Sequence, residues 1–264
     1  MKKIAIYCIN YHSYDCLKDY LSSIEVASKK AVQTAEIYVF VADNSIPSEG
    51  VDFRSPYFRL EVFPTGSNLG YFGAAEYVMS RVPPADFDYT IISNVDVLLT
   101  EKTFIELSEI PYDSTYGWIA PSLYSQTYHF DWNPQATKRY SVKKLKIMRF
   151  LFKHPLLLRL KQIILHKYRH IDTYPSGDIY AGHGSFIILT KSFFNKCGII
   201  HYPIFLYFEE LFLAETCRKN QLKVVYLPQI HVLDIGGTST GRIPSETYCK
   251  YNYEGIDYII SNYY

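Results

Sequence analysis

The fold is decided by a segment that begins Lys3-Ile4-Ala5-Ile6-Tyr7-Cys8-Ile9 and runs to Asp96. The opening run is apolar and rich in β-branched and aromatic side chains, which is typical of a buried strand. Strands are also predicted at 36–42, 59–63 and 88–93, and helices at 14–31 and 70–81. This alternation predicts an α/β fold with a Rossmann-like, mostly parallel central sheet flanked by helices.

Polar residues follow three of the predicted strands. Asn10 ends the first, Asp43 the second, and Asn94-Val95-Asp96 the strand at 88–93. Ligands of such sheets bind at the carboxyl ends of the strands, so the sequence predicts a polar site at this edge. Taken singly, Asp96 is better explained by a turn or helix cap, and Asp43 has the same ambiguity, with an Asx turn as its structural explanation. The functional alternatives are a carboxylate on a divalent metal for Asp96 and an acceptor for a ribose hydroxyl or base for Asp43.

A second candidate site lies in the stretch 204–241. An apolar and aromatic run precedes Glu209-Glu210, so burial is expected to raise the pKa of at least one of the two carboxyl groups. Asp234 precedes Gly236-Gly237 and two hydroxyl residues, and such a loop can approach phosphate or a metal ion closely. The alternative for the acid pair is a solvated helix N-terminus, where the helix dipole favours carboxylates.

The composition indicates an ordinary globular protein. The chain has 264 residues, of which 48% are hydrophobic and 20% charged. Its five cysteines show no CxxC spacing, which argues against a disulfide framework or a structural zinc site and favours a reducing compartment. The apolar run at 4–9 is too short for a signal peptide, and no apolar stretch is long enough to span a bilayer. We therefore expect a cytoplasmic protein.

The segment 138–170 differs from the rest of the chain. It holds eleven Lys or Arg and no acidic residue, so the net charge of +1 leaves 1 − 11 = −10 elsewhere. Apolar residues alternate with the basic ones, and Pro155 is expected to divide the segment into two helices. One interpretation is a peripheral contact with the anionic inner face of the plasma membrane. The other is a helical hairpin packed on the domain or on a second subunit of a homodimer. The acidic remainder disfavours nucleic acid as a partner.

Four short motifs follow the predicted strands of the N-terminal half. They are Ile9-Asn10-Tyr11-His12, Asp43-Asn44-Ser45, Asn68-Leu69-Gly70-Tyr71-Phe72-Gly73 and Ser93-Asn94-Val95-Asp96-Val97. Together they resemble motifs of the family 2 glycosyltransferases of the GT-A fold, especially the rhamnosyltransferase-like branch that acts on bacterial surface polysaccharides. In order, they are similar to the family's first strand end, its nucleotide-binding Asp-Asn-x-Ser, its Asn-x-Gly-Phe-x-Gly segment and its Leu-Asn-x-Asp-Val form of the DXD motif.

Two further motifs resemble the family's acceptor side. Tyr180-Ala181-Gly182-His183-Gly184, with the apolar strand that follows it, is similar to a Gly-Ala segment, and 207–213 to Tyr-Phe-Glu-Asp-x-Asp-Leu. The chain departs from the pattern by having Glu210 for Asp, Phe212 for a second Asp, Thr216 for Arg and Asp234 for a metal-binding His. Asp is also a hard oxygen ligand, so metal binding is compatible with this change.

The resemblance implies an inverting transfer from a nucleotide-diphosphate sugar to a hydroxyl of a glycan or lipid-linked glycan in cell-surface polysaccharide synthesis. It implies Glu210 as catalytic base, with Glu209 orienting the acceptor or supporting the Glu210 loop. Mn²⁺ or Mg²⁺ is expected on Asp96 together with Asp234. The implied nucleotide-sugar-binding residues are Asn10, Tyr11, Asp43, Asn68, Gly70, Asn94, Asp96 and Gly182.

The expected organisation is one GT-A domain over 1–264. It comprises a nucleotide-binding half, 1–100, an acceptor half, 101–243, with a small antiparallel sheet and the basic insertion 138–170, and a C-terminal helix, 244–264. Two other functions compete. The family departures fit a non-catalytic glycosyltransferase-like binding module of a polysaccharide assembly complex. A nucleotidyltransferase would need a glycine-rich basic loop after the first strand, and His12-Ser13-Tyr14-Asp15 is not one.

Overall fold

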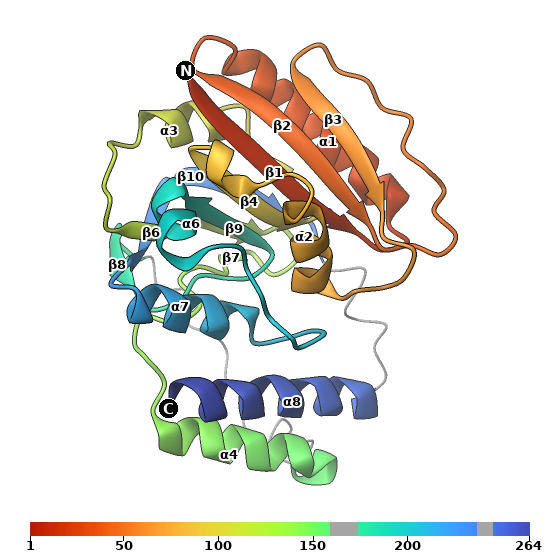
Figure 1. Cartoon of the computed structure of the whole chain (residues 1–264). Helices are drawn as coiled ribbons and strands as arrows, with labels where there is room; N and C mark the ends of the chain where they lie inside the picture. The colour runs from red at the N-terminus through yellow and green to blue at the C-terminus, as the bar shows by residue number, and fades with distance from the viewer. Residues whose placement is uncertain (159–173, 237–244) are drawn as a thin grey trace.

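Strands and helices alternate through the N-terminal half as the sequence predicts. The computed structural model describes residues 1–158, 174–236 and 245–264 (Figure 1). The predicted elements shift by at most two residues at either end, with a short 3₁₀ turn, η1, added. The elements of this half are β1 (Lys2–Asn10), α1 (Tyr14–Lys30), β2 (Ala35–Asp43), β3 (Phe58–Pro64), α2 (Tyr71–Met79), η1 (Pro84–Asp86) and β4 (Tyr89–Asn94).

The C-terminal half adds six strands and five helices within the described residues. The helix predicted at the C-terminus is present as α8. The elements are β5 (Val97–Leu99), α3 (Thr103–Glu109), β6 (Tyr116–Ser125), β7 (Phe130–Asp131), α4 (Val142–Lys153), β8 (Gly177–Ile179), β9 (Phe186–Thr190), α6 (Lys191–Cys197), α7 (Glu209–Lys219), β10 (Lys223–Asp234) and α8 (Ser245–Tyr263).

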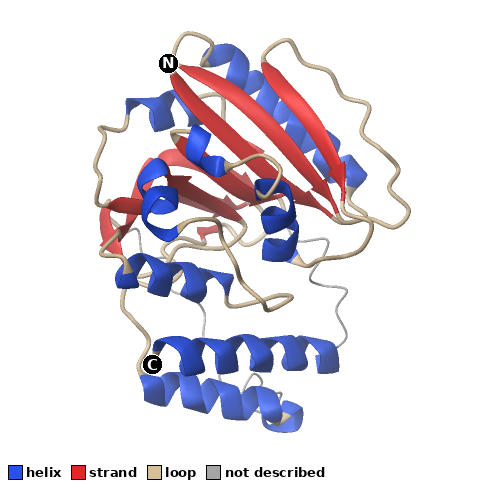
Figure 2. Ribbon diagram, in the orientation of Figure 1, coloured by secondary structure: helices blue, strands red, loops and turns tan. Residues whose placement is uncertain are grey.

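The described strands form one ten-stranded sheet in the order β3-β2-β1-β4-β9-β6-β10-β5, with β7 paired to β6 and β8 to β10. Strands β3, β2, β1 and β4 are mutually parallel, and β6 and β10 run in the same direction. Strand β9 is antiparallel to both of its neighbours. The antiparallel strands expected on the acceptor side are therefore part of the main sheet. The fold is mixed α/β with a mostly parallel central sheet flanked by helices, as predicted (Figure 2).

Both faces of the sheet are covered, which explains why β1 is apolar from Ile4 to Ile9. Ile4, Ile6 and Cys8 point to a core shared with α1 and α3. Ala5 and Tyr7 point to the opposite core, to which α2, α6, α7 and α8 contribute. Because successive strand residues face opposite sides, a central strand with helices on both faces carries apolar residues at every position.

Helix α4, from the basic segment, packs against α8 on the side away from the sheet (Figure 1). Leu145 is fully buried, Arg149 forms an ion pair with Asp257, and the rings of Phe152 and Tyr248 lie 6.1 Å apart. The helix ends at Lys153, before Pro155, as predicted. Residues 159–170 of the basic segment, and Gly237 with the two hydroxyl residues after it, lie outside the described residues. Within the described ranges, no helix is long and apolar enough to cross a membrane.

Candidate active site

The ends of β1 and β2 are joined by a buried hydrogen-bond cluster around Asp43. Parallel pairing places Asn10 beside Asp43, and the Asn10 amide donates to Asp43 Oδ1 at 3.1 Å. Tyr14 donates to Asp43 Oδ2 at 2.9 Å, and the Ser48 hydroxyl donates to the same oxygen. Burial alone would raise the pKa of Asp43, but donors including Ser48, Ser45 and Tyr14 hold the pKa below its ordinary value. Asp43 is therefore an ionised carboxylate whose oxygens are already occupied by neighbouring side chains.

The loop before α2 is fixed by close contact with the stretch that leads to the acid pair. Gly70 has a φ of +77°, and a Cβ there would lie 2.0 Å from the Phe205 carbonyl oxygen. Only glycine allows this conformation and this approach. The Asn44 amide donates to the Gly70 carbonyl at 2.9 Å, and the Tyr71 N–H donates to the Phe205 carbonyl at 3.4 Å. The predicted binding residue Gly70 thus connects the β2 end to the 204–208 loop.

Asp96 and Asp234 come together because β5 and β10 are antiparallel neighbours. Asp234 pairs with Val97, and the Ile235 N–H donates to the Asp96 carbonyl at 3.2 Å. Asp96 is only 6% exposed. The Asp234 carboxylate accepts hydrogen bonds from Trp132 Nε1 at 2.5 Å and from the Gly236 N–H at 3.1 Å. Two acids that are far apart in the sequence therefore lie at one sheet edge.

The Gly182–Gly184 segment connects these acids to Glu210. The Asn133 Oδ1 atom accepts the His183 N–H at 2.7 Å, and the His183 ring stacks on Trp132 at 5.3 Å. The next N–H, of Gly184, donates to Glu210 Oε1 at 3.2 Å, and a Cβ on Gly184 would lie 2.8 Å from that oxygen. Glycine at 184 therefore lets the Glu210 carboxylate reach the backbone.

Tyr71 lies where the two sides of the site meet. Its hydroxyl donates to the Gly184 carbonyl at 2.8 Å. Burial raises the pKa of Tyr71 well above its ordinary value, and negative charge on Glu209, and to a lesser extent on Glu210 and Asp96, raises it further. Tyr71 is therefore a buried phenol that stays protonated and donates to Gly184.

The acid pair occupies the first turn of α7, as the helix N-terminus alternative expected. Glu209, however, is only 5% exposed, so it is not a solvated end. Burial, followed by the charge of Glu210, raises the pKa of Glu209 to about 8. Tyr207 and Phe208 both have positive φ, and Glu209 Oε1 accepts the Tyr207 N–H at 3.0 Å. Glu209 thus supports a strained turn, whereas Glu210 is partly exposed.

The remaining predicted residues differ in their surroundings. Tyr11 is 43% exposed, next to Asn10. Asn68 uses its Oδ1 to accept the Gly70 N–H at 3.0 Å, and Asn94 donates its own N–H to the Ser185 carbonyl at 3.0 Å. A Cβ on Gly182 would lie 2.7 Å from the Ala120 Cβ, so this glycine allows close packing on β6.

Sequence reasoning missed Trp132 and Asn133, which hold Asp234 and the His183 backbone. Their only sequence signal is a tryptophan between two polar residues in a stretch without helical periodicity. The departure at Phe212 is explained by packing. It is 6% exposed, with its ring 4.8 Å from that of Tyr202 and 6.3 Å from that of Phe72.

Comparison with known proteins supports the fold assignment. No protein-family model and no curated protein sequence matches the chain. Among solved structures, S. aureus TarS matches with a TM-score of 0.54 and 9% identity over 89% of this chain and 37% of that one. Its 1-349 form matches with a TM-score of 0.50 and 10% identity over 88% and 60%. GalNAc-T7, solved with UDP, GalNAc and Mn²⁺, matches with a TM-score of 0.54 and 12% identity over 92% and 45%.

These similar structures are glycosyltransferases, and the chain has their GT-A-like fold. It spans 37% to 60% of the length of the chains it matches. At these identities the likeness shows the fold alone.

The donor set at the sheet edge is suited to a hard divalent cation. Among the described residues, no group of three or more His, Cys, Asp or Glu side chains could hold a metal ion by itself. Asp96 and Asp234 nevertheless supply carboxylate oxygens from adjacent strands, and Mg²⁺ or Mn²⁺ is often held by one or two carboxylates with substrate phosphates and water. The residues fit such an ion.

Proposed function

We propose that this protein is an inverting glycosyltransferase that moves a sugar from a nucleotide-diphosphate donor to a hydroxyl of a glycan or lipid-linked glycan. The observation that carries the proposal is the position of Gly184. Its carbonyl accepts from Tyr71 at 2.8 Å, and its N–H donates to Glu210 at 3.2 Å. Because Tyr71 begins α2 and Glu210 lies in α7, one residue joins the proposed donor side to the proposed base.

In this proposal Glu210 accepts the proton of the acceptor hydroxyl as it attacks the sugar. The hydrogen bond from Gly184 orients the carboxylate, and general-base catalysis of this kind contributes roughly 10²–10⁴-fold to a rate. Glu209 is held largely neutral by burial, so it serves to keep the 207–208 turn in place. Tyr71 keeps its proton and fixes the backbone between the two sides.

The donor is proposed to lie along the carboxyl ends of β1, β2 and β4. Tyr11 is exposed at this edge, and it offers a ring face to a base or sugar. Asp43 contributes by fixing the loop that follows β2. A ligand would reach the Asp43 carboxylate oxygens only by replacing the hydrogen bond from Ser48 or Tyr14. Asp96 and Asp234 would hold Mn²⁺ or Mg²⁺, which when bound neutralises charge on the departing diphosphate.

The proposal is tested by incubating the full chain with a panel of nucleotide sugars, Mn²⁺ or Mg²⁺ and glycan acceptors, and comparing Glu210→Gln with the wild type. We expect the variant to lose at least 100-fold in turnover while a thermal-shift assay still detects the nucleotide diphosphate. Glu254→Gln, which changes a partly exposed acid on α8, is the matched control. Unchanged turnover in Glu210→Gln would remove Glu210 as the base. Nucleotide binding without turnover in the wild type would favour the non-catalytic binding module.

We further propose that the protein acts at the cytoplasmic face of the plasma membrane, in surface-polysaccharide synthesis of the rhamnosyltransferase-like kind. The support is the face of α4 that does not pack on α8. Ile147 is 49% and Phe150 54% exposed there, and Val142 is 36% exposed. Lys143 and Lys146 border them. An apolar strip bordered by lysines suits an anionic lipid surface.

Liposome flotation tests the membrane contact. We expect the wild type to float with vesicles of phosphatidylglycerol and phosphatidylcholine, and Lys143→Glu/Lys146→Glu to remain in the soluble fraction. The control Lys18→Glu/Lys29→Glu makes the same charge change on α1. Equal flotation of both variants would exclude this face as the lipid contact. Light scattering on the same samples tests the alternative, in which the strip is covered by a second subunit.

A further inference from the structure

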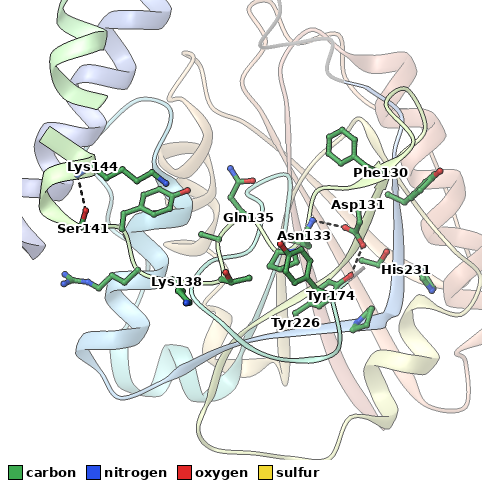
Figure 3. A pocket seen from close by; sticks show the side chains of 18 residues that line it. Phe130, Asp131, Asn133, Gln135, Lys138, Ser141, Lys144, Tyr174, Tyr226 and His231 are labelled. Carbon is green, nitrogen blue, oxygen red and sulfur yellow. Dashed lines mark hydrogen bonds between the residues drawn. The ribbon is translucent and has the colours of Figure 1, made fainter. Parts of the chain in front are cut away.

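A large cavity lies outside the candidate active site. It has a volume of about 920 Å³ and is bounded by β6, β7, β10 and the segment that leads into α4 (Figure 3). None of the predicted nucleotide-sugar-binding residues lines it. Its size is within the range of sites that enclose a small molecule or part of a longer one.

The walls of this cavity combine ring faces with hydrogen-bonding groups. Tyr124, Phe130, Tyr140, Tyr174 and Tyr226 supply aromatic surface. Gln135 supplies an amide (Figure 3). Tyr124 and Tyr174 are 39% and 41% exposed. Aromatic rings offer an apolar body with a polar tip, which suits ligands that present alternating C–H and hydroxyl groups.

The charge of the lining is positive. Lys138 and Lys144 both line the cavity, and Asp131 is the only acid among the described lining residues. The Asp131 carboxylate is already used, since it accepts from the Leu123 and Asn133 N–H groups and from the Tyr226 hydroxyl at 2.8–2.9 Å. Lys138 makes no ion pair with any described residue. An anionic ligand would therefore gain attraction without displacing a salt bridge of Lys138.

The cavity shares a wall with the candidate active site. Asn133 lines the cavity and accepts the His183 N–H at 2.7 Å, one residue before the Gly184 that binds Glu210. Phe130 lines it as well, and its ring lies 4.5 Å from that of Trp132, which donates to Asp234. Of residues 130–133, Phe130, Asp131 and Asn133 line the cavity, whereas Trp132 contacts Asp234 in the candidate active site.

We propose that this cavity binds a segment of the acceptor that lies beyond the reacting hydroxyl, and that this segment is an anionic saccharide carrying a carboxylate or a phosphate. Calling this saccharide the acceptor rests on the proposed function, but its binding to the cavity does not require sugar transfer. The tyrosine rings contact the sugar faces, and Lys138 and Lys144 pair with the acidic groups.

The test is isothermal titration of the full chain, without donor, with three probes: tetragalacturonate, mannose 6-phosphate and neutral maltotetraose. We expect the wild type to bind a charged probe at least tenfold more tightly than maltotetraose, with an affinity that falls as salt increases. The tighter of the charged probes identifies the carboxylate or the phosphate. Lys138→Glu/Lys144→Glu should lose at least tenfold in affinity for it.

Lys143→Glu/Lys146→Glu is the matched control, because it makes the same change of charge at two nearby lysines of α4 that do not line the cavity. Lys138→Gln/Lys144→Gln is a milder pair that should lose at least threefold, and it replaces the first variant if that one fails to fold. The inference is overturned if no charged probe binds better than maltotetraose, or if a folded Lys138/Lys144 variant binds as well as the wild type. Transfer activity with short acceptors is measured separately, so its loss would affect the proposed function and leave the titration result standing.

Discussion

The close approach of Phe205 to Gly70 in the candidate site allows a direct test of how its two sides are joined. In Gly70→Ala the new Cβ would meet the Phe205 carbonyl oxygen at 2.0 Å and the carbonyl carbon at 3.0 Å. Both atoms belong to the backbone, so no side-chain rotation relieves the clash. Ordinary contact begins at 3.4 Å, so the 205 segment must move by about 1.4 Å.

Two terms set the size of the effect. The backbone at Gly70, with φ 77° and ψ −166°, belongs to a region that is almost restricted to glycine. Alanine there costs about 1–3 kcal/mol. Overpacking against a fixed neighbour costs about 1–3 kcal/mol more. We therefore expect Gly70→Ala to lower the free energy of unfolding by about 2–6 kcal/mol.

Gly66→Ala separates the two terms. Gly66 has a similar φ of +74°, but a Cβ there meets nothing within 4 Å. This control should show the backbone term of about 1–3 kcal/mol alone. Both variants are compared by urea denaturation with a common m-value. Transfer is then assayed under conditions where each is folded, and Gly70→Ala should lose more activity because the displaced segment leads directly into Glu209 and Glu210.

The reasoning fails if Gly70→Ala is no less stable than Gly66→Ala. It also fails if the folded Gly70→Ala variant transfers sugar at the wild-type rate, because the contact would then not position the acid pair.

Three further predictions concern single contacts. Because burial raises the pKa of Glu209 from 4.5 to about 8, the folded chain keeps a proton that the unfolded chain loses above pH 4.5. The contribution of Glu209 to the free energy of unfolding is therefore fully present below pH 4.5 and is lost as the pH rises toward 8. The Tm should fall from about pH 6 to about pH 8.5, and the Glu209→Gln variant should show a smaller fall. Glu215 is fully buried between Arg139 and Arg218. The Glu215→Leu substitution should lower the free energy of unfolding, measured by urea denaturation, by about 2–3 kcal/mol. A decrease of less than about 1 kcal/mol would contradict this prediction. Trp132→Phe removes the hydrogen bond to Asp234 and should weaken Mn²⁺ binding about tenfold in a titration with nucleotide diphosphate present, whereas unchanged affinity would argue against Asp234 as a ligand.

Much of the N-terminal half could be predicted because its signals are local. Each strand and helix from Lys2 to Asn94 carries its own periodicity and its own stop, and parallel order brings the strand ends to one edge. Asn10 and Asp43 therefore lie side by side as expected, and Asn94 lies beside Ile9. The burial of Glu209 was likewise predictable from the apolar run before it.

The chemistry around these residues depends on partners that the local pattern does not contain. Asp43 resembles a ligand-binding residue in the sequence, yet its oxygens accept from Tyr14 and Ser48. Trp132 carries no motif, and its role follows from a contact with a residue 102 positions away.

The sequence by itself determined the α/β class, the polar edge of the sheet and the acid pair at the start of α7, because these depend on residues within a few positions of each other. Only the tertiary structure decided that β9 runs antiparallel between β4 and β6, and that β5 pairs with β10 so that Asp96 meets Asp234. It also decided which face of α4 is covered by α8. Such pairings depend on the burial and hydrogen bonding of the whole chain, so they cannot be predicted from any short segment of the sequence.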